Sequence, residues 1–196
     1  MSGDSSQQVG LNIPLRFIFK PSYSPHCINT NVRVNTLMDK AILKLKEEIT
    51  SEDWQISLSA AERLANIKTK ESLQVLVDSL KSENHLIRNA AALGPMQTSD
   101  QEYVEPLIKR IKELGPEEEI GTLVYALEDF DCSAILPDIV TLYLKGNFEV
   151  RQATTNILNK QSFKVTTKEL NEIENELKDY EYSLDSFKVN YQLKGE

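Results

Sequence analysis

The sequence predicts an all-α protein, a right-handed α-solenoid of about four to five antiparallel helix pairs with an extended N-terminal segment. Helical periodicity continues through most of the chain from Asn35 onward. One apolar pattern also returns at intervals of about 30 residues, and such a period is typical of repeat architectures. A unit of that length buries its apolar face only against its neighbours, so consecutive repeats become consecutive layers.

The repeated pattern is clearest at residues 56–67. Its apolar residues lie at steps of four, four and three: Ile56, Ala60, Leu64 and Ile67. These steps form one stripe along a helix with 3.6 residues per turn, and the small Ala60 and Ala61 allow a second helix to approach closely. Similar stretches begin at Ile87, Ile120 and Val150, so successive starts are 31, 33 and 30 residues apart.

The composition is that of a soluble globular protein, with 196 residues, 40% hydrophobic and 27% charged. The net charge of −8 and the pI of about 5.0 argue against a nucleic-acid partner, because phosphate contact needs clustered lysines and arginines. The acidity suits a protein partner with a basic surface, and it also suits simple solubility.

The two cysteines, Cys27 and Cys132, match no metal-binding or redox spacing. We expect two buried, reduced thiols in a cytoplasmic protein. No signal-peptide pattern is visible at the N-terminus, and no apolar stretch approaches the roughly 20 residues of a membrane span. We therefore expect no membrane partner.

The first 34 residues differ in character from the rest of the chain. Residues 11–19 are rich in β-forming side chains, and Pro14, Pro21 and Pro25 argue against a helix. We expect residues 1–34 to form an extended segment that covers the apolar end of the solenoid. A short strand that pairs with another chain is the alternative.

Helices should then alternate through residues 35–183. The first carries an apolar stripe at Leu37, Ala41, Leu45 and Ile49, widened by Ile42 and Leu43. Capping boxes are predicted at residues 50–53, 99–102 and 166–169. Further helices are expected at about residues 54–68, 70–81, 83–94, 134–145 and 148–159. Three more are expected from the box at 99–102 to Leu114, from Pro116 at a first helical position, and from the box at 166–169 through Tyr180. The tail, residues 184–196, is apolar enough to dock, as either strand or coil.

These residues resemble HEAT-like repeats, in particular the short variety of the phycobilisome lyases. The family pattern of the second helix is V-R-x-x-A-A-x-A-L-G, and residues 56–65, Ile87-Arg88 and Val150-Arg151 match parts of it. Ser57 and Gly121 depart from the arginine. The resemblance covers residues 36–160, and it implies a scaffold whose concave face, formed by the second helices, grips another macromolecule. A fold of this kind does not by itself imply a function.

One subset of these families is more similar. Residues 121–128, 131–133 and 146–151 resemble small acidic bacterial HEAT-like proteins, some of which are immunity proteins against secreted toxins. That resemblance implies a cytoplasmic inhibitor that masks a toxin domain. The alternatives are a general HEAT-repeat scaffold or adaptor and, less favoured, a phycobilin-lyase-like protein that handles a chromophore. HEAT-like DNA glycosylases need a basic face, which this acidic sequence does not supply.

No catalytic motif emerges. His26 and His85, the two histidines, are far apart and lie in no metal-ligand spacing. Phosphate loops, nucleophile elbows and zinc-protease motifs are absent from the sequence. We therefore expect a protein that is not an enzyme, takes no cofactor or metal, and is a monomer without its partner.

Carboxylates near helix starts are the best candidates for partner contact. In a solenoid, equivalent helix starts line up along one edge, so these groups should form a negative strip, or else serve only solubility and the helix dipole. Trp54 is either a core residue or a contact anchor, and Arg88 either bonds to a neighbouring loop or contacts the partner. The candidate partner-binding residues are Glu52, Asp53, Trp54, Arg88, Glu117, Glu118, Glu119, Glu128, Asp129, Asp131, Asn147 and Glu149.

Overall fold

A computed structural model of the chain describes residues 26–115, 118–180, 184–191 and 193–195. The chain divides into two compact units, Met1–Thr36 and Leu37–Glu196. Of the extended segment predicted over residues 1–34, residues 1–25 lie outside the described residues, so its role as a cover stays a prediction.

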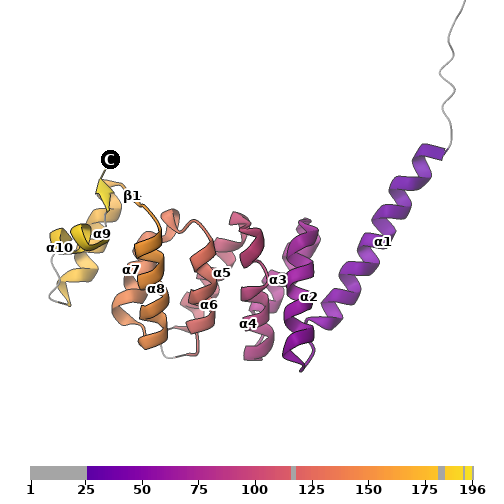
Figure 1. Ribbon diagram of the computed structural model, residues 1–196, viewed down its shortest axis with the longest axis horizontal. Helices are drawn as coiled ribbons and strands as arrows, with labels where there is room; N and C mark the ends of the chain where they lie inside the picture. Colours follow the sequence, from indigo (N-terminus) through magenta and orange to yellow (C-terminus); the bar gives the residue numbers. More distant parts are fainter. Residues whose placement is uncertain (1–25, 116–117, 181–183, 192, 196) are drawn as a thin grey trace, which may run out of the picture. The chain divides into compact units, whose positions relative to one another are not determined.

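The second unit is built almost entirely from helices, which confirms the predicted all-α class. Figure 1 shows these helices in sequence order along the unit, with α4, α6 and α8 in front of α3, α5 and α7. The α-helices of the chain are α1 (His26–Glu48), α2 (Trp54–Ile67), α3 (Lys70–Leu80), α4 (His85–Leu93), α5 (Val104–Leu114), α6 (Gly121–Ala126), α7 (Leu136–Lys145), α8 (Phe148–Lys160), α9 (Thr167–Lys178) and α10 (Leu184–Tyr191).

Helices that alternate along the chain pack into layers. In one layer α2 contacts α4, α4 contacts α6, and α6 contacts α8. The other helices pack behind them, with α3 against both α2 and α4, and α7 against α8 and α9. A single hydrophobic core runs between the layers, from Ile42 to Leu193. The repeated apolar pattern thus supplies one face of each helix to a continuous core.

Helix α1 corrects two predictions. It begins at His26, well before the predicted start near Asn35, so residues 26–34 are helical rather than extended. Prolines up to Pro25 do not prevent this, because a proline before the first helical turn removes no helical hydrogen bond. Within the second unit its buried residues are Ile42, Leu45 and Ile49, whereas Leu37 is 68% exposed.

Helix starts also differ in detail from the predicted capping boxes. Asp53 rather than Thr50 caps α2, and its Oδ1 accepts from the Gln55 amide at 2.8 Å. Asp100 caps a short 3₁₀ turn that precedes α5. Only the third predicted box, Thr166 with Glu169 at the start of α9, is confirmed. Aspartate is among the best side chains for this position, so it displaces the start by one or more residues.

The C-terminal tail docks mainly as a helix, which neither predicted alternative included. Phe187 of α10 is buried, and its ring centroid lies 6.1 Å from that of Tyr143 on α7. Strand β2 (Lys194–Gly195) then pairs in parallel with β1 (Lys164–Val165). Among the described helices, none is both long and apolar enough to cross a membrane.

Candidate functional site

A groove between α6 and α8 opens on the layer formed by α2, α4, α6 and α8. Its volume is about 580 Å³, within the range of pockets that take ligands or peptide segments. We name it the α6–α8 groove and define it by six of its lining residues: Gly121, Thr122, Tyr125, Phe148, Glu149 and Gln152.

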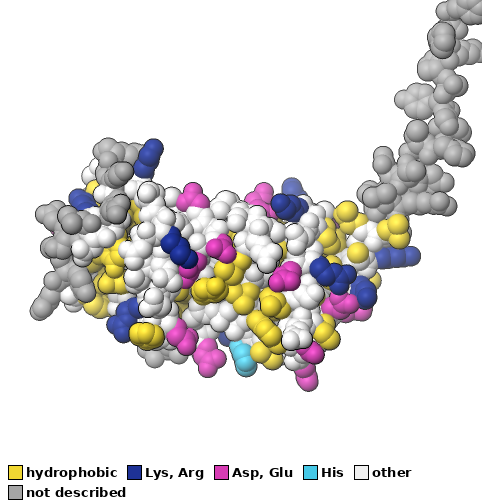
Figure 2. Space-filling model, viewed as in Figure 1, with side chains coloured by type: hydrophobic (Ala, Val, Ile, Leu, Met, Phe, Trp, Pro, Cys, Tyr) yellow, Lys and Arg dark blue, Asp and Glu magenta, His cyan; other side chains and the backbone are white. Residues whose placement is uncertain are grey.

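Two aromatic side chains make this groove unusual. Tyr125 is 50% exposed and Phe148 is 74% exposed, and both line the groove. Isolated apolar residues on a surface need no explanation, but aromatic side chains that gather around a hollow are typical of protein contact sites. Figure 2 shows hydrophobic side chains gathered over this face, with carboxylates around them.

Glu149 lies at the mouth of the groove. It lies in the first turn of α8, where Asn147 Oδ1 caps the helix by accepting from the Val150 amide at 3.0 Å. A Cβ atom on Gly121 would lie only 2.6 Å from Glu149 Oε2. The absence of a side chain at Gly121 therefore provides the space that the Glu149 carboxylate occupies.

The far end of the groove is closed by a polar network. Glu128 is 9% exposed, and its two oxygens accept from Asn156 Nδ2 at 3.0 Å and from Lys160 Nζ at 2.5 Å. The hydrogen bond to Glu128 raises the pKa of Lys160. The Glu128 carboxylate, which the sequence analysis selected for partner contact, is thus already paired with Lys160. It links the end of α6 to α8.

The predicted acidic edge exists in part. Successive helix starts lie along one edge of the layer, at the lower side of Figure 1. Exposed polar side chains stand at the starts of α2, α6 and α8: Glu52, Asp53, Glu118, Glu119, Asn147 and Glu149. Glu117 lies outside the described residues. Whether these groups contact a partner stays a prediction.

Asp129 and Asp131 do not join this edge, because they follow the last turn of α6 and so lie at its other end. Asp131 Oδ1 accepts from the Ser133 amide at 2.9 Å, and hydrogen bonds from Ser133 lower the pKa of Asp131. The prediction of a single strip was therefore wrong for these two residues and for Glu128. Because helix α6 is short, the acidic residues at its start and at its end appear as one cluster in the sequence.

The remaining two candidates, Trp54 and Arg88, pack against or hydrogen-bond with the rest of the chain. Trp54 is half-buried and packs against the core. Arg88 is only 5% exposed, and one guanidinium nitrogen donates to the Ser82 and Glu83 carbonyls at 3.1 and 3.4 Å. Arg88 therefore holds the loop before α4, as one of the two alternatives predicted, and it is not accessible to a partner.

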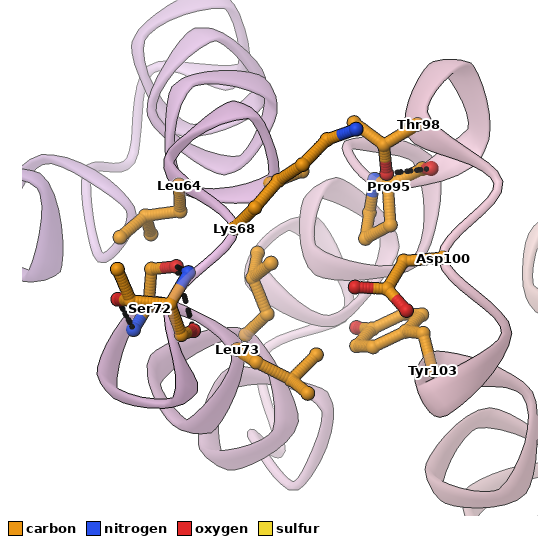
Figure 3. Close-up of a pocket in the computed structure, with 11 residues that line it drawn as sticks. Leu64, Lys68, Ser72, Leu73, Pro95, Thr98, Asp100 and Tyr103 are labelled. Carbon is orange, nitrogen blue, oxygen red and sulfur yellow. Dashed lines mark hydrogen bonds between the residues drawn. The ribbon is translucent and has the colours of Figure 1, made fainter. Parts of the chain in front are cut away.

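A second hollow lies between α2, α3 and the turn after α4, where Lys68 extends toward Thr98 and Pro95 (Figure 3). Its volume of about 10 Å³ holds about one water molecule. Tyr103 at its edge is buried and donates its hydroxyl to the Ala91 carbonyl at 2.8 Å. This hollow has the character of a packing defect.

The described residues give little support for a metal site or a reactive nucleophile. Among them, no three histidine, cysteine, aspartate or glutamate side chains gather as metal ligands would. Burial raises the pKa of the Cys132 thiol to about 12, so this thiol stays protonated and unreactive at neutral pH.

Tyr125 and Phe148, which the sequence analysis did not select, are the residues that distinguish this surface. The sequence could have indicated them, because each is an apolar residue that lies off the buried stripe of its helix.

Comparison with known families supports the repeat assignment. Residues 42–120 match the sequence profile of the family described as HEAT repeats. The match runs from the second half of α1 to the residue before α6, so HEAT-like repeats are supported there. The α6–α8 groove follows the matched region. No curated protein matches the chain.

Proposed function

We propose that this protein is a non-enzymatic binding module that holds another protein against the face formed by α2, α4, α6 and α8. The observation that carries this proposal is the α6–α8 groove with its exposed Tyr125 and Phe148. HEAT repeats over residues 42–120 suggest a protein-interaction scaffold, which agrees with it. In such arrays, successive helices present a broad surface that can follow a partner.

The finer form of the proposal concerns the partner. A net charge of −8 and exposed carboxylates at the starts of α2, α6 and α8 favour a partner with a basic surface, which they would attract over a distance. The resemblance of residues 121–128, 131–133 and 146–151 to immunity proteins suggests a bacterial toxin domain, occluded in the cytoplasm by a monomeric inhibitor. A general scaffold or adaptor is the alternative.

The test combines capture from the native host with matched variants. Tagged wild-type protein, the double variant Tyr125→Ala with Phe148→Ala, and the control Tyr180→Ala would be compared. Tyr180 is also an exposed aromatic residue, but it lies beyond the end of α9. Co-purifying chains would be identified by mass spectrometry, and their affinities then measured with purified components.

We expect one partner to be retained by wild type and Tyr180→Ala. The double variant should bind it at least about 10-fold more weakly, since truncation of one aromatic hot-spot residue costs about 2 kcal/mol or more and about 1.4 kcal/mol is a tenfold change in affinity. Equal binding by all three proteins would show that the groove is not the contact surface. A recovered toxin domain would support the immunity hypothesis, and any other partner would favour a scaffold.

A further inference from the structure

The α6–α8 groove combines two kinds of recognition chemistry. Aromatic surface comes from Tyr125 and Phe148, and a carboxylate comes from Glu149. The electron-rich faces of aromatic rings attract cations, and a carboxylate does so by charge. Both features therefore favour a positively charged group, whereas they disfavour a phosphate or a carboxylate.

Glu149 also carries the charge that is free at this groove. Glu128 is already paired with Lys160, and no ion pair of Glu149 is found among the residues that the structure describes. The Glu149 side chain is exposed, and its carboxylate lies in the space above Gly121. The charge is thus present at the groove and not neutralised by any described side chain before a partner arrives.

A lysine or arginine side chain matches this arrangement in shape as well as in charge. Its methylene stem can lie along aromatic surface while its head group reaches a carboxylate. The groove volume of about 580 Å³ exceeds what one side chain fills, so apolar neighbours of that cation have room beside Ala153 and Leu93, which also line the groove.

We propose that the α6–α8 groove binds a partner segment in which a lysine or arginine stands next to apolar residues. The cation lies between Tyr125, Phe148 and Glu149, and the apolar residues fill the rest of the groove. This inference rests on the proposed function, since it identifies the chemistry of the segment that the binding face receives.

The first probe is a display library of random twelve-residue peptides, selected on the full-length protein. We expect the enriched peptides to share an arginine or lysine beside leucine, isoleucine or an aromatic residue. The Glu149→Gln variant should bind a synthetic copy of such a peptide at least about 10-fold more weakly. Replacement of the basic residue of the peptide by glutamine should weaken wild-type binding to a similar extent.

Two further variants separate position from charge. Gly121→Ala places a Cβ atom where the Glu149 carboxylate lies, so it should weaken binding although all charges are kept. The control Glu102→Gln removes an exposed carboxylate at the start of α5 and should leave affinity unchanged. Circular dichroism and thermal unfolding would verify that each variant is folded.

The outcomes distinguish this inference from the proposed function. Enriched peptides without a basic residue, no enriched peptide, or binding that is insensitive to Glu149→Gln would overturn the inference. If the natural partner is still lost with the Tyr125 and Phe148 double variant, the binding face stands and only its preference for a cation is wrong. If the partner ignores that double variant as well, the proposed function itself fails.

Discussion

At the scale of a residue, the role of Glu128 in the structure differs from the role that its sequence context predicted. From the sequence it is one of several acids around a short helix, suited to meet a basic partner. In the folded chain its oxygens are bound by Asn156 and Lys160, which come from α8. A nearly buried carboxylate of this kind stabilises the fold rather than the complex.

Replacement of Glu128 tests this role. Glu128→Ala leaves the Asn156 amide and the Lys160 ammonium without their acceptor, and it should reduce the free energy of unfolding by about 1–3 kcal/mol. Asp129→Ala is the matched control, since Asp129 is exposed, and should change stability by about 0.5 kcal/mol or less. Urea denaturation followed by circular dichroism measures both. Equal stability of the two variants would contradict the structural role of Glu128.

Asp131 should make stability depend on pH in the acid range. Its pKa is lowered from 3.8 by hydrogen bonds from Ser133, so the folded state binds its proton less readily than the unfolded state. The resulting stabilisation is present above about pH 3.8 and is lost as the pH falls through the folded-state pKa. Wild type should therefore exceed Asp131→Asn in stability at pH 6 and lose that advantage progressively as the pH falls below about 3.8. A difference in unfolding free energy that does not change with pH would count against this assignment.

At the scale of elements, small residues decide how closely α4 and α2 approach. A Cβ atom on Gly94, which follows α4, would lie 2.6 Å from the backbone carbonyl carbon of Ala61 on α2. No flexible side chain is available there to move aside, so the helices themselves must shift.

Gly94→Ala is thus expected to be destabilising, although alanine favours a helical conformation. We expect a loss of about 1–3 kcal/mol, as is usual when atoms are added to a packed interior. Ser59→Ala on the exposed side of α2 is the control and should have little effect. Thermal unfolding measures both variants, and a neutral or stabilising Gly94→Ala would show that α2 and α4 are not packed this closely.

Elements were predicted better than their boundaries. The alternation of helices followed from apolar periodicity, because each helix must bury one stripe whatever its neighbours are. The register of α1 did not follow, since apolar residues cover more than half of its circumference and two stripes compete. Packing within the second unit, Leu37–Glu196, buries Ile42, Leu45 and Ile49. The start of α2 moved because Asp53 caps it in preference to Thr50.

At the scale of the whole molecule, net negative charge should act on the rate of association. Under the proposed function, Glu118→Lys with Glu119→Lys reverses two charges on the acidic edge beside the α6–α8 groove. Association with a basic partner should become slower by about 10-fold at low salt, while dissociation changes less. Stopped-flow kinetics at several salt concentrations measure this effect.

The control places the same charge change elsewhere. Glu102→Lys with Glu105→Lys alters the total charge equally, but on the start of α5 in the other layer. If both double variants slow association to the same extent, the total charge rather than the acidic edge attracts the partner.

The helical class and the repeated apolar pattern could be predicted from the order of the residues without any structure. The sequence also excluded the common catalytic motifs. These properties are local or periodic, so residues within a few turns of one another contain them. The tertiary structure alone decided which polar groups face solvent. Glu128 is bound by Asn156 and Lys160, 28 and 32 positions away, whereas Glu149 has no ion pair among the described residues. It also brought Tyr125 and Phe148 to one groove, because the pairing of distant helices determines which side chains share a surface.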